Sequence, residues 1–324
     1  MATFKVTKGT PVAFRDSAYP TAYPSGHEGE LFYNSSAGAF QFIGPAIGAW
    51  STGGNVNTAR KALSGFGTQT AAIAATGNTP PTVTDVESYN GTAWSEVAEV
   101  NTGKFYRGNC GTQAAGLLIG GAPSTGDVEE WNGNGWTETA NYPGNITGPI
   151  LLGIQTAAFC IGGDVPPYTT ATNIYNGASF TSSTAINTAR ATAIGSGSTT
   201  AAVIAGGTTP SATVNTEVWD GSSWTEVAGN LNTARELFGG SGNSSSNLIG
   251  FGGNATAVAN TETWDGTSWT EVADLATGRR ELGGSTNGTN LVALAFAGCT
   301  APGSVQNSTE EWDFAHSLKT IDVS

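Results

Sequence analysis

The feature of this sequence that most constrains its fold is an internal repeat of about 44 residues. An aromatic residue closes each of five similar segments, and successive members are 42, 44, 44 and 45 residues apart: Trp94, Trp136, Phe180, Trp224 and Trp269. One further step of 44 residues back from Trp94 reaches Trp50, which opens the series. A fixed period of this size is typical of proteins built from stacked supersecondary units. The length of 324 residues therefore does not indicate the number of domains.

Each period contains the same signals in the same order. It begins with a turn-like NTAR motif, seen at Asn57–Arg60, Asn187–Arg190 and Asn232–Arg235, with the variants NTGK at Asn101 and ATGR at Ala276. An apolar run closed by glycine follows, such as AAGLLIGG from Ala114, and short runs of this kind predict buried strands. After a polar loop come a strand that ends in an aromatic residue, an Asn-Gly or Asp-Gly turn, and a second aromatic residue five positions after the first. This combination predicts a β-hairpin.

Each period therefore predicts four short antiparallel strands, which is the content of one propeller blade. The whole pattern predicts an all-β fold, a six-bladed β-propeller over residues 46–324. Glycines would allow the inner strands to approach one another near the axis, and the wide aromatic rings would fill the space between adjacent blades. No segment has the 3.6-residue periodicity of an amphipathic helix, so no helix is expected.

The sixth unit departs from the pattern because its hairpin lacks the Asp-Gly turn. If Trp312 is its first aromatic residue, Ser317–Val323 is predicted to be the returning arm. The ring must also be closed, and Phe42–Thr52 could add a strand beside the last blade or lie against its edge. The sequence leaves both closures open.

Residues 1–45 differ from the repeats and are predicted to be a separate attachment arm ahead of the propeller domain at 46–324. This arm carries Pro11, Pro20 and Pro24 and lacks the repeat signals. Its segment Gly29–Gly44 predicts a β-hairpin with four apolar side chains available for burial: Leu31, Tyr33, Phe40 and Phe42. Exposed alone, these rings would be an apolar patch, so we expect the arm to pack on another subunit. A chain of residues 46–324 should then fold yet fail to assemble.

The composition excludes several classes of partner. Twelve Lys and Arg against 25 Asp and Glu give a net charge of −13, which would repel nucleic acid phosphates. No apolar run approaches the length of a membrane-spanning helix, and the start MATFKVTKGT lacks a signal-peptide core, so no membrane insertion is expected. The three cysteines, Cys110, Cys160 and Cys299, have no C-x-x-C spacing and are expected to be buried free thiols.

The sequence offers little for catalysis, which needs a group of residues with matched acidities or a metal. His27 and His316 are the two histidines, both outside the regular repeats, and are expected at the surface. We predict no catalytic residue, no metal ligand, no cofactor-binding residue and no cofactor. Asp220 and Asp265 begin the hairpin turns at the position that asparagine occupies elsewhere, which indicates turn capping: Asn90, Asn132 and Asn176.

The recurring arginines allow two interpretations. Four of them, Arg60, Arg190, Arg235 and Arg279, could form a ring that binds a carboxylate or phosphate on one face. They could equally pair with Glu217, Glu262 or backbone carbonyls. Because a feature repeated in every unit usually builds the unit, the structural interpretation is favoured.

Partner recognition is expected in the loops between the buried strand and the hairpin, because they vary most in length and composition. These loops are Asn78–Thr84, Pro123–Asp127, Asp164–Thr172, Thr208–Asn215 and Ala255–Asn260. No individual contact residue in them is predicted.

The paired glycines and paired aromatic residues over residues 50–324 resemble Kelch-repeat propellers. The hairpin GELFYN at Gly29, together with NTAR, apolar-Gly-Gly and EVWDGSSW units, resembles Kelch-like proteins of tailed bacteriophages, especially marine ones, over the whole chain. The resemblance implies a non-enzymatic virion structural protein, a tail or tail-fibre component assembled in the host cytoplasm and oligomeric in the particle. It would contact other virion subunits through residues 1–45 and a host surface receptor or glycan through its propeller loops.

Two alternatives remain open at this point. One is a cellular Kelch-like protein–protein interaction module, which the lack of an attached adaptor domain disfavours. The other is a carbohydrate-active propeller enzyme, which the missing catalytic constellation disfavours.

Overall fold

The computed structural model describes residues 13–15, 31–34, 38–301 and 303–321. The chain divides into two compact units. One comprises the described residues up to Gly48 together with those from Phe314 onward, and the other is Ala49–Asp313. The predicted domain boundary after residue 45 stays a prediction. Across the described ranges, no helix has the length and apolarity needed to span a lipid bilayer.

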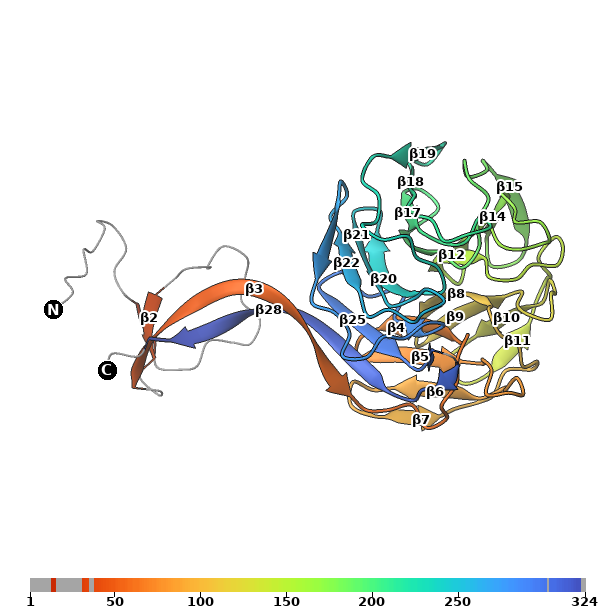
Figure 1. Cartoon of the computed structure of the whole chain (residues 1–324). Coiled ribbons are helices and arrows are strands. Elements are labelled where there is room, and N and C mark those ends of the chain that lie inside the picture. Colours follow the sequence, from red (N-terminus) through yellow and green to blue (C-terminus); the bar gives the residue numbers. More distant parts are fainter. Residues whose placement is uncertain (1–12, 16–30, 35–37, 302, 322–324) are drawn as a thin grey trace. The chain divides into compact units, whose positions relative to one another are not determined.

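The unit Ala49–Asp313 is a ring of six blades, each a twisted antiparallel sheet (Figure 1). Five of the blades are separate four-stranded sheets with the strands in chain order. Blade 1 is β4 (Ser64–Thr68), β5 (Ala71–Ala75), β6 (Val86–Tyr89) and β7 (Trp94–Glu96). Blade 2 is β8 (Gly108–Thr112), β9 (Ala115–Ile119), β10 (Val128–Trp131) and β11 (Trp136–Glu138). Blade 3 is β12 (Ile150–Ile154), β13 (Ala157–Ile161), β14 (Thr172–Tyr175) and β15 (Phe180–Ser183).

Blade 4 is β16 (Ile194–Gly197), β17 (Ala202–Ala205), β18 (Thr216–Trp219) and β19 (Trp224–Val227). Blade 5 is β20 (Gly239–Ser244), β21 (Asn247–Phe251), β22 (Thr261–Trp264) and β23 (Trp269–Val272). Blade 6 is β24 (Gly283–Gly284), β25 (Val292–Phe296), β28 (Thr309–Thr320) and β3 (Ala39–Gly53), with the short hairpin β26 (Cys299–Thr300) and β27 (Ser304–Val305) in its loop. The predicted all-β, six-bladed propeller is confirmed.

The predicted hairpins form the third and fourth strands of the first five blades. In blade 4, for example, Trp219 lies opposite Trp224 across the Asp-Gly turn, with their ring centroids 5.5 Å apart. The corresponding pairs in the other four blades have centroids between 4.7 and 5.7 Å apart. The five repeated aromatic residues thus occupy equivalent positions, at the start of each outermost strand.

Aromatic rings and glycines also make the contacts between blades. Trp94 of blade 1 packs against Phe296 of blade 6 at 4.8 Å, and its indole N–H donates to the Thr309 hydroxyl at 3.1 Å. Near the axis, a Cβ on Gly65 would lie 2.7 Å from the carbonyl oxygen of Gly284 in the neighbouring blade. Only glycine permits that approach, as the sequence predicted.

Backbone hydrogen bonds join the blades around the axis. Shortly before each innermost strand, one residue with positive φ donates its N–H to the carbonyl of its equivalent in the preceding blade: Ala62, Tyr106, Gly148, Thr192, Leu237 and Glu281. The N···O distances are 2.7–3.3 Å, and the circuit is closed because Ala62 donates to Glu281. The six units are therefore linked by a continuous ring of main-chain bonds.

The ring closes with a strand from the N-terminal side of the repeats. β3 pairs with β28 as the fourth strand of blade 6, which is the first of the two closures considered. The predicted returning arm Ser317–Val323 is wrong over its described part, because β28 continues without a turn to Thr320. Without an Asp-Gly turn the chain does not reverse after Trp312, and Trp50 of β3 supplies the second aromatic ring, 5.5 Å from Trp312.

The other unit contains the predicted hairpin. β1 (Ala13–Arg15) pairs parallel with β2 (Leu31–Asn34), and β2 pairs antiparallel with β3, with Leu31 opposite Phe42. Leu31 and Phe40 are each 40% exposed, whereas Phe32 is fully buried, and the packing of this hairpin on another subunit stays a prediction. Side chains alternate between the two faces of a strand, and the buried face is the one that carries Phe32. Most of the preceding Pro- and Tyr-rich stretch lies outside the described residues.

Candidate binding face

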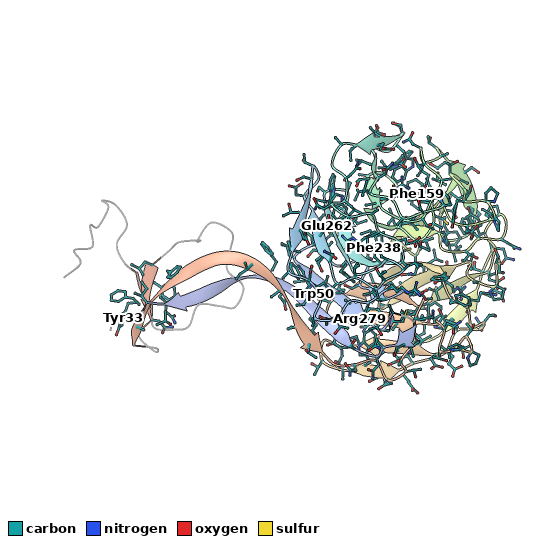
Figure 2. All side chains as sticks on the ribbon, viewed as in Figure 1. Tyr33, Trp50, Phe159, Phe238, Glu262 and Arg279 are labelled. Carbon is teal, nitrogen blue, oxygen red and sulfur yellow. The ribbon has the colours of Figure 1, made fainter. Side chains whose placement is uncertain are left out.

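The four predicted arginines do not present a charged face. Arg60, Arg190, Arg235 and Arg279 are fully buried, and each pairs with a glutamate on the third strand of its blade. The N···O distances are 2.5 Å to Glu87, 2.6 Å to Glu217, 2.6 Å to Glu262 and 2.7 Å to Glu310. Arg279 and Glu262 lie inside the body of the propeller unit (Figure 2). The structural interpretation of the arginines is confirmed, and an anion site built from them is excluded by their burial.

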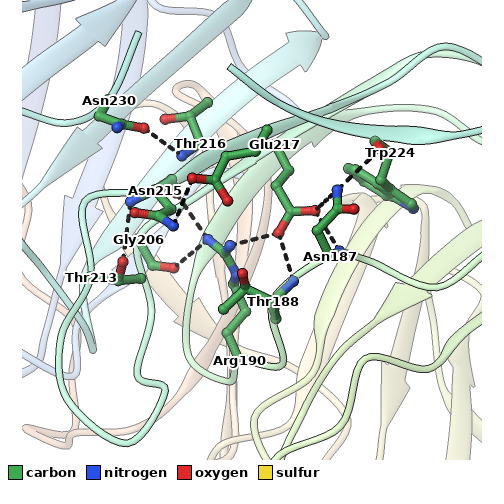
Figure 3. A network of polar contacts seen from close by, with 11 residues as sticks. Asn187, Thr188, Arg190, Gly206, Thr213, Asn215, Thr216, Glu217, Trp224 and Asn230 are labelled. Atoms are coloured by element: carbon green, nitrogen blue, oxygen red, sulfur yellow. Dashed lines mark hydrogen bonds and ion pairs between the residues drawn. The ribbon is translucent and has the colours of Figure 1, made fainter. Parts of the chain in front are cut away.

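The arginine of the NTAR motif and its glutamate form a buried ion pair, which we call the strut. Figure 3 shows this pair in blade 4. The Arg190 guanidinium donates to Glu217 and to the carbonyls of Gly206, at 3.1 Å, and Asn215, at 2.9 Å. The other oxygen of Glu217 accepts from the backbone N–H of Asn187 at 2.7 Å. Desolvation lowers the pKa of Arg190, and the charge of Glu217 opposes that shift. The motif therefore ties the turn before each blade to that blade's third strand.

Two blades carry variations that the motif search missed. In blade 2 the strut is Arg107, 2.7 Å from Glu129, while Lys104 occupies the arginine position of the motif and pairs with Asp127 at 3.4 Å. Because Arg107 lies three residues after the motif position, the NTAR pattern does not identify it.

Blade 3 has no strut. Ile146 and Asn173 stand where Arg190 and Glu217 stand in blade 4, and the Asn173 side chain donates to the Tyr142 hydroxyl at 2.8 Å. Both charged partners are replaced together, so no unpaired charge is left buried. Comparing the units at a step of 44 residues would have revealed this exchange.

The hairpin aspartates cap turns, as predicted. The Asp220 carboxylate accepts backbone N–H bonds from Ser222 and Ser223, each at 2.8 Å, and Asp265 is bound in the same way. These bonds, led by that from Ser223, lower the pKa of Asp220 to about 2. Asn90 makes the equivalent contacts in blade 1. Asp and Asn interchange because both offer the same acceptor oxygen.

The remaining candidate groups do not form a reactive centre within the described residues. Cys110, Cys160 and Cys299 are buried and free, as expected, and burial raises the pKa of Cys110 to about 12. A thiol of that kind is a poor nucleophile at neutral pH. His27 lies outside the described residues, as does the side chain of His316. Among the described positions, no His, Cys, Asp and Glu side chains gather in a group that could hold a metal ion.

The five loops predicted to carry recognition lie on one face of the ring. Each connects the second and third strands of its blade, for instance Asp164–Thr172 after β13 and Thr208–Asn215 after β17. Because strand order and direction are the same in every blade, these connections emerge on the same side. We call this side the binding face.

A groove of about 510 Å³ lies on the binding face between blades 3 and 4. It is lined by Asp164, Pro166, Pro167, Tyr168, Ala189, Thr209 and Pro210. Loops of three blades are built alike, each closed by a bridge between residues four apart: Asn78 with Thr82, Asp164 with Tyr168, and Thr208 with Ala212. Of these three loops, the one in blade 3 places an acid and a phenol at the two bridge positions.

A second cavity, of about 130 Å³, lies on the axis among the starts of the innermost strands. It borders buried polar atoms that have no protein hydrogen-bond partner within the described chain: Asn109 Oδ1, Thr192 Oγ1 and Thr286 Oγ1. This volume has room for several water molecules, which could satisfy these atoms. It is below the range of about 300–1,000 Å³ typical of small-molecule sites.

The charge of the protein is concentrated in the propeller unit. Ala49–Asp313 contains eight Lys and Arg and 21 Asp and Glu, a net charge of −13 that equals that of the whole chain. All eight cations form ion pairs, and none is among the exposed residues. Seven acids share these pairs, which leaves fourteen carboxylates of this unit without a cationic partner among the residues that the structure describes.

No family model matches this sequence, and no curated protein sequence matches it. Among solved structures, the one titled "Structure of YjhT" superposes with a TM-score of 0.66 at 14% identity, covering 80% of this chain and 96% of that one. At that identity the likeness shows the fold alone. Strand order, blade count and this superposition together identify the repeat region as a six-bladed β-propeller.

Proposed function

We propose that this chain is a non-enzymatic structural protein of a bacteriophage particle, a tail or tail-fibre component that presents its propeller for host attachment or for contacts with other virion subunits. The proposal draws on the resemblance of the GELFYN hairpin and the repeat units to Kelch-like proteins of tailed phages.

The observation that carries the non-enzymatic part is the use made of the recurring charged side chains. The arginines and glutamates of five blades are buried against each other, and the hairpin aspartates bind main-chain N–H groups. Arg and Glu side chains buried against each other are shielded from a ligand, and the aspartates serve as caps of the turns. What varies from blade to blade is the binding face, and a constant scaffold with variable loops is the usual design of a recognition protein.

Mass spectrometry of purified particles tests the virion role. The protein should be present in a fixed number of copies per particle and should survive repeated banding in a density gradient. A phage-encoded protein of DNA replication serves as the control for carry-over from the lysate. Recovery in the soluble lysate alone, with none in banded particles, would refute the proposal.

The non-enzymatic part has its own test. Purified protein should contain no stoichiometric metal and should show no hydrolytic or oxidase activity on carbohydrate substrates. One copper or zinc per chain, or turnover that follows the protein through purification, would instead favour the carbohydrate-active enzyme.

A further inference from the structure

We propose that the groove between blades 3 and 4 binds a neutral saccharide. This inference rests on the proposed function, because it names the class of ligand that the binding face would recognise on a host surface.

The shape of the groove fits a small ligand. Its volume of about 510 Å³ lies within the range of roughly 300–1,000 Å³ seen for small-molecule sites, and the groove is open to solvent, so a ligand would be bound on one side. Tyr168 supplies a flat ring, and Pro166, Pro167 and Pro210 supply rigid apolar walls. The C–H-bearing face of a pyranose packs against surfaces of this kind, and a tyrosine contributes both an apolar face and a hydroxyl.

Asp164 supplies the polar end of the site. Its backbone is fixed by reciprocal bonds with Thr147, at 2.8 and 3.0 Å, so the point at which the side chain leaves the main chain is well defined. Its carboxylate makes no hydrogen bond or ion pair within the described chain. Hydroxyl groups are good donors to such an oxygen, and hydrogen bonds to an ionised acceptor are about twice as strong as neutral ones.

Charge selects a neutral ligand over an anionic one. No Lys or Arg lines the groove, and every cation of the propeller unit is already paired with an acid. A sialic acid, uronic acid or phosphorylated sugar would therefore meet the Asp164 carboxylate without a compensating cation in the groove. A hydroxyl-rich neutral sugar avoids that repulsion.

Blade 3 differs from the other blades in ways that are consistent with a role in ligand binding. It lacks the buried strut, and Ser182 stands on its outermost strand where four other blades carry a glutamate: Glu96, Glu138, Glu226 and Glu271. It also exposes Val165 at the groove loop. Blade 3, which contributes Asp164 and Tyr168 to the groove, thus has fewer charged residues than its neighbours.

Saturation-transfer NMR on the full-length protein tests the site. The probes are methyl glycosides of glucose, galactose, mannose and N-acetylglucosamine, with N-acetylneuraminic acid as the anionic comparison and a Pro-Pro-x-Pro peptide as the rival ligand. The site variants are Tyr168→Thr and Asp164→Asn, which introduce the residues that the matching loop of blade 1 carries at Thr82 and Asn78, so the loop should fold. Thr82→Ala in blade 1 is the matched control.

At least one neutral glycoside should show transfer, and its Kd should rise at least about tenfold in each site variant while staying unchanged in Thr82→Ala. Absence of transfer from every neutral glycoside overturns the proposal. So does equal binding by Tyr168→Thr, preference for the anionic sugar, or tighter binding of the peptide.

Failure of this inference can be told apart from failure of the virion role. Phage carrying Tyr168→Thr should still incorporate the protein but adsorb to its host several-fold more slowly. If the protein is missing from wild-type particles, the virion role fails even where the purified protein binds the glycoside. If it is present and adsorption is unchanged, the saccharide site fails and the virion role stands.

Discussion

At the residue scale, the polar side chains that recur in the repeat serve the fold. The turn aspartates show this most simply, because their carboxylates accept main-chain N–H bonds that the asparagines accept elsewhere. A carboxylate bound in this way differs from an amide in one respect, which is that it titrates.

The acid sensitivity of these caps can be predicted. The pKa of Asp220 falls from its ordinary 3.8 to about 2, and that of Asp265 is also lowered. Since the folded-state pKa lies below the unfolded one, the stabilising contribution is present above about pH 4 and is lost as the pH falls toward 2. Asp220→Asn/Asp265→Asn should therefore match wild type at pH 7, within about 2 °C in the midpoint of thermal unfolding. It should lose less stability than wild type between pH 4 and pH 2.

Thermal unfolding followed by circular dichroism across this range provides the measurement. Glu96→Gln, an exposed change on an outermost strand, is the control and should not reproduce the effect. Identical acid profiles for wild type and the double variant would contradict the capping argument.

The buried struts predict a different response. Arg190→Ile leaves Glu217 buried without its partner, which should cost about 3–5 kcal/mol. In blade 3 the positions of Arg190, Glu217 and Ile186 are held by the uncharged residues Ile146, Asn173 and Tyr142. The triple variant Arg190→Ile/Glu217→Asn/Ile186→Tyr places the same residues in blade 4 and should recover most of the lost stability. Urea unfolding of the two variants and wild type gives the comparison, and a triple variant no more stable than the single one would contradict it.

The role of a residue could be predicted from the sequence where other repeats carry a comparable residue at the same position. The capping role of Asp220 was predicted because three other units carry asparagine there. The pairing of Arg107 with Glu129 could not be predicted in this way. Arg107 lies three residues after the motif position, and a motif compares residues only at equivalent positions. Tyr168 was inside a predicted loop, but the groove also needs Pro210 from the next blade, and a single unit contains no information on that neighbour.

At the element scale, the closure of the ring was the feature that sequence left open. Both arrangements of Phe42–Thr52 would have covered the edge of the last blade. The missing Asp-Gly turn after Trp312 was the informative signal, because a strand that does not reverse leaves its edge available for β3.

Trp50 is the residue through which the strength of this closure can be tested. Its ring lies 5.1 Å from that of Phe251 and 5.5 Å from that of Trp312, and its N–H donates to the Thr261 hydroxyl at 3.1 Å. Trp50→Ala should destabilise the propeller by about 2–4 kcal/mol, somewhat less than for a fully buried tryptophan. Ser51→Ala, an exposed neighbour on the same strand, should have little effect. Equal midpoints of urea unfolding for Trp50→Ala and wild type would show that β3 is dispensable to the ring.

At the scale of the whole molecule, the division into two compact units indicates which deletion best tests whether the arm attaches the protein to the particle. Within the described part of the first unit, the carbonyl of Phe40 accepts from the Ile321 N–H at 2.8 Å, and Gln41 donates to the Thr320 hydroxyl at 3.2 Å. A chain that starts at residue 46 would leave Thr320 and Ile321 without these partners. The cleaner deletion therefore removes both flanks.

A chain of residues 49–313 should stay soluble and unfold cooperatively, because it keeps all six blades and the portion of β3 that closes the ring. It should fail to enter particles, whereas the full chain should be incorporated. Complementation of a phage that lacks the gene, followed by mass spectrometry of the particles, compares the two. Equal incorporation would place the anchor in the propeller itself.

The closing strand also determines how late in synthesis the ring of a new chain can close. β3 leaves the ribosome before any blade, yet its partner β28 begins at Thr309, 256 residues after β3 ends at Gly53. At roughly 5–20 residues per second, β3 waits roughly 10 to 50 seconds for the edge that it pairs with. Until then the nascent chain holds five completed blades and an open seam. Neighbouring ribosomes on one message bring a β3 and a seam from different chains together, so crowded synthesis raises the chance that strands are exchanged between chains.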